Sequence, residues 1–458
     1  MDANILWSLR LGFSGKQAND IQRLGMVSFL EESFRPQPVI ALPDFLAESP
    51  ATIKELNTIK RTFRETDPEC LKEFVSKEAA IAQQLRLWWL DKIMVDNRPL
   101  REKMTIFWQN HFVVSYKKVK MNRWLFEYNE LLRQNAFGNF KTLTKSILKT
   151  NAMVRYLDND GSRKGKINEN LSRELLELFT LGIGNYTEDD IKSGARGLAG
   201  LHNGETSAAY QFKFQDNTPI VYFGKTGIFK ADELVDIIFE QPEIPYLLTR
   251  KILKWFINDL PDEKMVRYYG DYFRLENFEI QPLLVKIFTE EAKRNNAGTK
   301  IKDPLLYVLQ VAGELRIDNP DSKLLAPFLR QQGMELFEQP NVKGWSGGRE
   351  WLTIQLFSQR NNVADQLCRG RAINGSKVKN IEGETITNKP MPYWRKKGDN
   401  VSVIEELKSR LLFAVTPELQ ADFEKILKYD FDPNSESADG AVLRLFYYMV
   451  CTPEFQLI

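Results

Sequence analysis

The sequence predicts a mainly α-helical protein, with a single large multi-helix domain over residues 1–458 and one small inserted β-hairpin. Three observations lead to this fold class. Apolar residues recur at a spacing of three or four along most of the chain, which is typical of helices with one buried face. The alternation that indicates a strand is confined to a stretch near 207–227. Hydrophobic residues make up 43% and charged residues 27% of the chain, a composition that allows a large buried core.

The predicted helices follow one another from the N-terminus with mostly short connections. Ser14 and Gln17 form a capping box that opens the first helix, and Thr187 with Asp190 predicts the N-terminus of another. A proline-bearing connector covers 36–50. The predicted helical segments are 21–34, 51–94, 100–112, 124–132, 140–148, 168–181, 187–198, 231–239, 246–257, 265–273, 281–292, 303–312, 323–331, 403–413, 417–427 and 441–451.

Two segments break the helical pattern. In the first, Tyr210, Phe212 and Phe214 alternate with polar residues, a turn follows, and a second apolar run begins at Ile220. This pattern predicts a β-hairpin over 207–227. The second segment, residues 369–400, is long, polar and rich in glycine, and we expect it to form a long loop outside the core.

The stretch 168–182 (NENLSRELLELFTLG) is the densest set of polar groups with a helical period, and its last residue, Gly182, is a natural helix stop. At about 100° per residue, Glu169, Arg173 and Glu177 fall on one side of this helix. They form a ladder at i, i+4 and i+8 with a cation between two carboxylates. The opposite, apolar side consists of Leu171, Leu175, Leu178 and Phe179.

The ladder allows two interpretations. On a solvated helix face each pair would contribute roughly 0.2–0.5 kcal/mol, and no function would follow. Buried under other helices, the ladder would form a polar cluster able to bind a polar ligand or a cation. Removing Arg173 from such a cluster would strand two carboxylates and cost roughly 3–5 kcal/mol.

Five pieces of the chain resemble, in the same order, motifs of the bacterial DUF1800 family, a domain of unknown function. The resemblance covers essentially the whole chain, and it leads us to expect the ladder to be at least half buried and paired. The five pieces are RLGF at 10–13, FWQNHF at 107–112, the stretch from Asn168 to Thr187, PNVKGWSGGREW at 340–351 and PEFQ at 453–456.

The chain departs from the family pattern in two places. Gln109 replaces the first histidine of the family's Phe-Trp-His-Asn-His-Phe motif, and the segment 215–224 lacks the histidine that the family commonly has there. If those histidines carry chemistry in relatives, this chain lacks part of it.

The candidate site residues come from the central stretch and from the motifs that the resemblance brings with it. His111 lies on an apolar helix side, where a histidine is more often part of the core than a ligand or a base, although an imidazole titrates at a useful pH. The candidate catalytic residues are His111, Glu169, Glu174 and Glu177. The candidate binding residues are Asn110, Asn168, Asn170, Arg173, Lys343, Trp345 and Arg349.

No cofactor or metal is indicated by the sequence. His111 and His202 are the only histidines, which excludes a site with three histidines in one chain. Asp158, Asp160 and Glu169 match part of an EF-hand count, but the position of its glycine is occupied by an arginine. This leaves only a weak argument for a divalent cation.

Several classes of protein are disfavoured. A net charge of +2 gives no overall attraction for nucleic acid, and the chain has no 18-residue apolar run that predicts a membrane span. The first fifteen residues lack the features of a signal peptide, so we expect a cytoplasmic protein, although relatives in the DUF1800 family are often exported. Three distant cysteines suggest neither a disulfide framework nor a zinc knuckle.

Two classes of function remain open. The first is a binding or accessory protein that presents a tryptophan-lined polar groove to a partner protein or to a polar polymer such as a glycan. The second is a hydrolase that uses a carboxylate of the central stretch together with His111. The resemblance also implies a first partner to test, because DUF1800 genes often stand beside genes of the DUF1501 family, whose members are similar to sulfatases and alkaline phosphatases.

Overall fold

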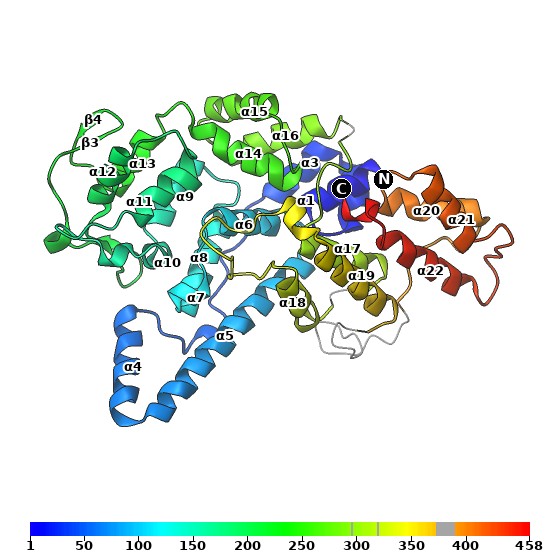
Figure 1. Ribbon diagram of the computed structural model, residues 1–458, viewed down its shortest axis with the longest axis horizontal. Helices are drawn as coiled ribbons and strands as arrows, with labels where there is room; N and C mark the ends of the chain where they lie inside the picture. The colour runs from blue at the N-terminus through cyan, green and yellow to red at the C-terminus, as the bar shows by residue number, and fades with distance from the viewer. Residues whose placement is uncertain (295, 318–319, 372–389) are drawn as a thin grey trace.

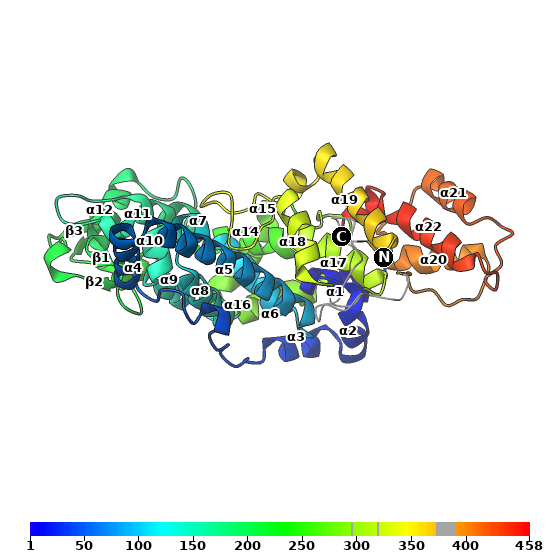
Figure 2. The same ribbon diagram turned by 90° about the horizontal axis from the view of Figure 1, so that it is seen from below.

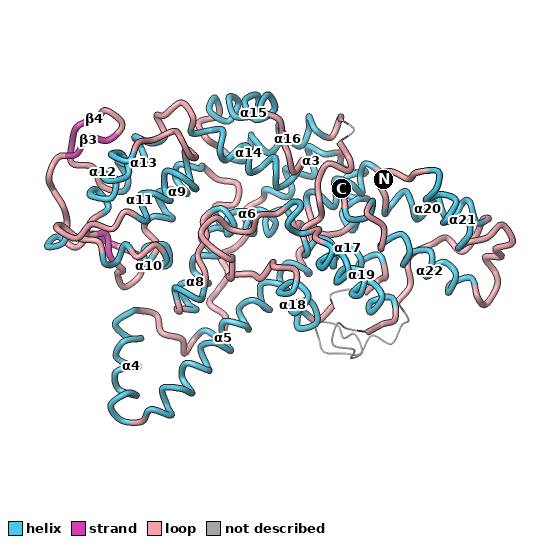
Figure 3. Tube along the Cα trace, in the orientation of Figure 1, coloured by secondary structure: helices cyan, strands magenta, loops and turns pink. Residues whose placement is uncertain are grey.

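A computed structural model of the protein describes residues 1–294, 296–317, 320–371 and 390–458. Helices make up nearly all of the regular structure, and the strands are confined to one end of the molecule (Figure 3). The predicted mainly α fold is therefore confirmed. The molecule is elongated, with helices α20, α21 and α22 at one end and the strands with helix α12 at the other (Figures 1 and 2).

The first half of the chain forms the strand-bearing end and part of the middle. Its helices are α1 (Ala3–Leu11), α2 (Ala18–Leu24), α3 (Met26–Phe34), α4 (Ile53–Thr66), α5 (Pro68–Val95), α6 (Leu100–His111), α7 (Tyr116–Val119), α8 (Asn122–Gln134), α9 (Phe140–Leu148), α10 (Asn151–Tyr156), α11 (Asn170–Glu174), α12 (Glu188–Leu198) and α13 (Ala231–Ile238). The capping box predicted from Thr187 and Asp190 is present at the start of α12.

The second half completes the middle and forms the other end. Its helices are α14 (Ile244–Phe256), α15 (Glu263–Leu275), α16 (Ile280–Glu291), α17 (Pro304–Glu314), α18 (Ser322–Gln331), α19 (Ile354–Cys368), α20 (Asn400–Leu411), α21 (Pro417–Ile426) and α22 (Ala438–Val450). The segment between α18 and α19 crosses the middle of the molecule near α6 (Figure 1).

Helices α4 and α5 form a hairpin whose far end stands away from the body (Figure 1). Helix α4 buries Leu56 against α5, and the remaining side chains of α4 keep contact with solvent. Helix α5 is more buried in its second half, where Leu85 and Trp89 pack in the core.

Small β-hairpins are present in this region, as predicted, but the predicted pairing of the run from Tyr210 to Phe214 with the run from Ile220 is wrong. Strand β1 (Leu201–His202) pairs with β2 (Ala209–Tyr210), and β3 (Ile220–Tyr222) pairs with β4 (Lys225–Gly227), both antiparallel. A short 3₁₀ helix, Phe212–Phe214, lies where a strand was expected. The alternating aromatic residues there do not share a sheet face, because Phe214 stacks on His202, with 4.9 Å between ring centroids.

One cluster of buried apolar residues extends from Trp7 to Phe455 and includes residues from nearly every helix. This continuity agrees with the single domain predicted for 1–458, which stays a prediction. Of the predicted loop at 369–400, residues 372–389 lie outside the described part of the chain. The described residues 390–399 contain no helix or strand before α20 begins at Asn400. The expectation that the segment lies outside the core is wrong for Trp394, which is 4% exposed and belongs to the buried apolar cluster.

Candidate functional site

The motif at the end of α6 is in direct contact with the glycine-rich motif before α19. The Oδ1 atom of Asn110 accepts a hydrogen bond from the backbone N–H of Trp345 at 2.7 Å. Gly344 has a φ of +81°, and a Cβ atom at this position would lie 2.3 Å from the same Oδ1 and 2.5 Å from the backbone oxygen of Asn110. Glycine therefore allows both the left-handed backbone and the close approach.

The central stretch is a helix that changes its winding. Helix α11 continues from Leu175 to Thr180 as a π-helix, in which the N–H of Leu181 bonds to the carbonyl of Leu176 at 3.0 Å. The wider turn changes the angle between successive side chains, so the faces differ from those expected at 100° per residue. Leu176 and Thr180 are buried, whereas Leu178 is only partly buried.

The carbonyl groups at the end of this π-helix are bound by two side chains from other helices. His111 Nε2 lies 3.1 Å from the carbonyl oxygen of Phe179, and Lys251 Nζ donates to the carbonyl oxygen of Leu178 at 2.8 Å. Lys251 Nζ also lies 3.1 Å from His111 Nδ1. These contacts fix the tautomer, because Nε2 must carry the proton to bond a carbonyl and Nδ1 then accepts from the ammonium group.

A cavity of about 200 Å³ opens beside this His111–Lys251 pair. It is lined by the end of α6, one face of α14, the loop before α17 and the glycine-rich motif. Three lining residues are tryptophans, four are lysines and one is an aspartate. The lining residues are Phe107, Asn110, His111, Lys251, Lys254, Trp255, Asp259, Lys300, Lys343, Trp345, Ser346, Gly347, Gly348 and Trp351.

Burial lowers the pKa of three groups in the cavity wall. It lowers the pKa of His111 well below its usual value, and the nearby Lys251 cation acts in the same direction. Burial also lowers the pKa of Lys251 to about 8 and that of Lys300 from its usual value. At neutral pH the imidazole is therefore uncharged, and Lys251 is still mostly protonated.

Two tryptophans of the wall carry indole N–H groups that have no hydrogen-bond partner within the described part of the chain. They belong to Trp255, which is 9% exposed, and Trp345, which is 5% exposed. Buried donors are normally satisfied, so these two N–H groups are an exception among the described residues.

The buried imidazole leads to a prediction about pH and stability. In the unfolded chain His111 takes up a proton near pH 6.5, whereas the folded chain keeps it neutral. Below pH 6.5 the unfolded state therefore binds more protons, and His111 lowers the free energy of unfolding by about 1.4 kcal/mol per pH unit. In denaturant titrations between pH 5 and 7, the free energy of unfolding should fall less steeply with decreasing pH for His111→Gln than for the parent chain. Equal slopes for the two chains would contradict this account.

Four of the residues expected from the sequence line the cavity, namely Asn110, His111, Lys343 and Trp345. The other seven lie elsewhere. Asn168 lies just before α11, and its Oδ1 accepts from the N–H of the exposed Asn170 at 2.9 Å. Arg349 is exposed beside the cavity wall without lining it. The remaining four, Glu169, Arg173, Glu174 and Glu177, form a separate surface on the central helix.

The prediction that Glu169, Arg173 and Glu177 form a half-buried, paired ladder is partly correct. Arg173 and Glu169 are 36% and 38% exposed and form an ion pair at 3.2 Å, so more than half of each side chain is buried, as expected. The second partner of Arg173 is Glu188 of α12, at 2.9 Å, and not Glu177. The Glu177 carboxylate accepts instead from the Tyr186 hydroxyl at 3.1 Å.

This surface is not the sealed cluster that the sequence suggested, because water reaches all of these groups. Glu188 is 65% exposed, so removing Arg173 leaves carboxylates that solvent can still hydrate. A loss of several kcal/mol is therefore no longer expected. Burial raises the pKa of Glu174, the Glu177 charge acts in the same direction, and Lys343 acts in the opposite direction.

Sequence reasoning missed Lys251, Lys254, Trp255, Asp259 and Lys300. The helix that carries the first three was predicted at 246–257, and its spacing places Lys251, Lys254 and Trp255 on neighbouring positions of one face. Nothing in the sequence indicated that this face would lie against His111, because the contact depends on the tertiary arrangement of α6, α14 and the π-helix.

The first and last motifs, at 10–13 and 453–456, contribute to the core of the protein. Arg10 is fully buried and donates to the backbone carbonyls of Ile257 and Asn296. At the other end of the chain, the Lys302 ammonium donates to the carbonyl oxygen of Phe455. Both contacts satisfy backbone groups that would otherwise be buried without partners, and neither motif lines the cavity.

Among the described residues, no three or more acidic, histidine or cysteine side chains are placed to hold a metal ion. Asp158 of the EF-hand-like count pairs with Lys118 at 2.7 Å.

In the part of the chain that the structure describes, no helix combines the length and apolar character needed to cross a bilayer.

The fold and the cavity together define a helical protein with a small aromatic and cationic pocket where the motifs at 107–112 and 340–351 meet. The chain belongs to the DUF1800 family, described as "Protein of unknown function", which it matches over residues 4–457. No curated protein and no solved structure shows significant similarity to it.

Proposed function

We propose that this protein is a binding or accessory protein that holds one unit of a polar polymer, a glycan, in the tryptophan-lined cavity. The proposal rests on the aromatic residues that line the cavity. Trp255, Trp345 and Trp351 gather around one small space, and two of their indole N–H groups have no partner in the described chain. A sugar ring offers an apolar face for stacking and hydroxyl oxygens for such donors, a combination that suits tryptophan.

The size of the cavity supports a single unit as the occupant. At about 200 Å³ it is smaller than the roughly 300–1,000 Å³ typical of sites for drug-sized molecules. It therefore accommodates a terminal sugar or one branching unit, with the rest of the polymer outside. The exposed side chains of Lys254 and Lys343 at the rim would contact that outer part.

The arrangement favours binding over the hydrolase alternative. A hydrolase using His111 with Glu169, Glu174 or Glu177 needs an imidazole nitrogen free to take a proton and a carboxylate that faces it. The two nitrogens of His111 are engaged by Phe179 and Lys251, and the three glutamates do not line the cavity. The expected DUF1501-like partner stays a prediction, and such a protein could supply chemistry on a glycan held here.

The proposal is tested by titrating the full chain with oligosaccharides and following tryptophan fluorescence and heat. We expect Trp345→Ala to weaken binding by about 30-fold, which corresponds to the roughly 2 kcal/mol of a buried aromatic anchor. Trp345→Phe keeps stacking but lacks the indole donor, so it should weaken binding less, and it guards against a folding defect. The control is Tyr429→Ala, a 92% exposed aromatic residue.

Two results would contradict the proposal. The first is binding that both Trp345 variants leave unchanged while they remain folded. The second is release of reducing ends from the bound oligosaccharide by the chain alone, which would favour the hydrolase.

A further inference from the structure

The cavity wall carries more positive charge than its own residues neutralise. Among the described residues that line it, the cations are Lys251, Lys254, Lys300 and Lys343, and the single carboxylate is Asp259. Lys300 lies 3.5 Å from that carboxylate. Among the described residues, the ammonium groups of Lys251 and Lys254 form hydrogen bonds with neutral acceptors.

Lys251 is the most informative of these cations. Its ammonium group donates to the carbonyl oxygen of Leu178 and to His111 Nδ1, two neutral acceptors. A charged amine that is largely removed from water is costly without a counter-ion, and a carbonyl dipole offsets only part of that cost. An anion bound in the cavity would supply the missing charge. Burial of this ammonium group lowers the pKa of Lys251 to about 8.

The neighbouring groups favour an oxyanion on a ring-shaped ligand. Among the described residues, the Lys254 ammonium group donates to the backbone oxygen of Ser346 at 3.4 Å, and Lys254 is exposed enough to turn toward a ligand. Trp345 and Trp255 have indole N–H groups without a partner among the described residues, and carboxylate and sulfate oxygens are strong acceptors for such donors. The tryptophan faces provide the apolar contact for the ring itself.

We infer that the cavity recognises the acidic group of an acidic glycan, a carboxylate or a sulfate ester, with Lys251 at its floor and Lys254 and Lys343 at its rim. This inference rests on the proposed function for the glycan and on the charge of the wall for the acid. Glu174 lies near Lys343 and weakens the field at that rim, so Lys251 carries most of the preference.

The experiment compares an acidic oligosaccharide with its uncharged methyl ester and with other anions. Tetragalacturonate, its methyl ester and a sulfated galactose tetramer are titrated into the full chain, together with acetate and inorganic sulfate. We expect the acid to bind at least about tenfold more tightly than the ester at low salt, and we expect added salt to reduce that advantage. A preference for the sulfated tetramer instead identifies the group as a sulfate ester and supports the same inference.

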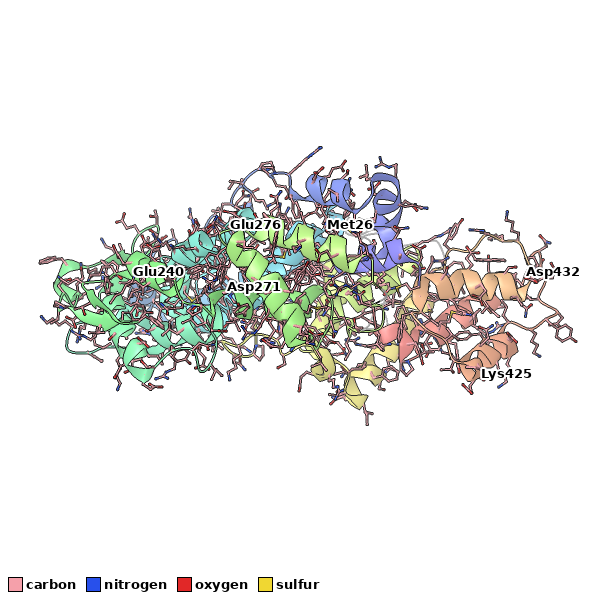
Figure 4. The ribbon with its side chains drawn as sticks, turned by 90° about the horizontal axis from the view of Figure 1, so that it is seen from above. Met26, Glu240, Asp271, Glu276, Lys425 and Asp432 are labelled. Atoms are coloured by element: carbon pink, nitrogen blue, oxygen red, sulfur yellow. The ribbon has the colours of Figure 1, made fainter. Side chains whose placement is uncertain are left out.

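Lys251→Met should bring the affinity for the acid to that for the ester while leaving the ester unchanged. Because Lys251 is buried, Lys343→Gln at the exposed rim is a second variant with little risk to folding, and a smaller loss is expected there. The matched control is Lys425→Met, whose side chain is 74% exposed on α21 at the far end of the molecule (Figure 4). It should leave every affinity unchanged.

The two proposals fail in different ways. If the ester binds as well as the acid, in a manner sensitive to Trp345→Phe, the glycan proposal stands and the acidic inference is overturned. If no oligosaccharide binds but acetate or sulfate binds and Lys251→Met abolishes it, the anion site stands and the glycan proposal fails. If neither simple anions nor acidic glycans respond to Lys251→Met, the acidic inference is overturned.

Discussion

Replacing Gly344 with alanine is expected to lower the free energy of unfolding by about 2–5 kcal/mol. Two costs add at this position. The backbone has a φ of +81°, where an L-residue with a Cβ atom loses roughly 1–2 kcal/mol. The new Cβ would also lie 2.3 Å from Asn110 Oδ1 and 2.5 Å from the Asn110 carbonyl oxygen. The contact can be relieved only by separating the two motifs that build the cavity.

A matched glycine separates the two costs. Gly165 has nearly the same φ, +80°, but a Cβ atom there would meet nothing within 4 Å. Gly165→Ala should therefore lose only the backbone part, about 1–2 kcal/mol, in the same denaturant titration. Gly344→Ala should also weaken ligand binding because Trp345 would be displaced. Equal losses for the two variants would mean that the Asn110 contact does not constrain the fold.

Much of the fold was predictable because helical periodicity depends on local sequence. The segment 100–112 was assigned correctly, since Leu100, Met104 and Trp108 all face the core as their spacing implies. The strands were harder to predict. Their pairing in units of two or three residues is decided by contacts such as that of Phe214 with His202, which leave no periodic signal in the sequence.

The site was predictable only where a motif marked it. Asn110, His111 and Trp345 were found in this way, and they lie together. Lys251 escaped because its role comes from burial against His111 and the π-helix, a tertiary property. The partners of the Glu169–Arg173–Glu177 ladder were wrong because a π-helix was not foreseen, and its wider turn moves Glu177 away from the position that a regular helix would give it.

Replacing Arg133 with methionine is expected to cost about 3–5 kcal/mol of stability, because it breaks a buried ion pair from one side. Arg133 is 1% exposed, and its Nε lies 2.7 Å from the Oε1 atom of Glu102, which is fully buried. Glu102 also accepts from the indole of Trp89 at 2.8 Å. Without the guanidinium group, the Glu102 charge would remain in the core with one indole donor and Lys92, 3.8 Å away.

Arg173 forms comparable ion pairs at the surface, so its replacement shows how burial changes the free energy lost. Arg173→Ala removes a guanidinium group with two carboxylate partners, as Arg133→Met does, but these groups are 36–65% exposed. Its loss should lie within about 1 kcal/mol. In the core, Glu102→Gln combined with Arg133→Met should recover part of the loss, since a neutral amide is cheaper to bury than a lone carboxylate. Similar losses for Arg133→Met and Arg173→Ala in chemical denaturation would show that burial does not set the cost of breaking these pairs.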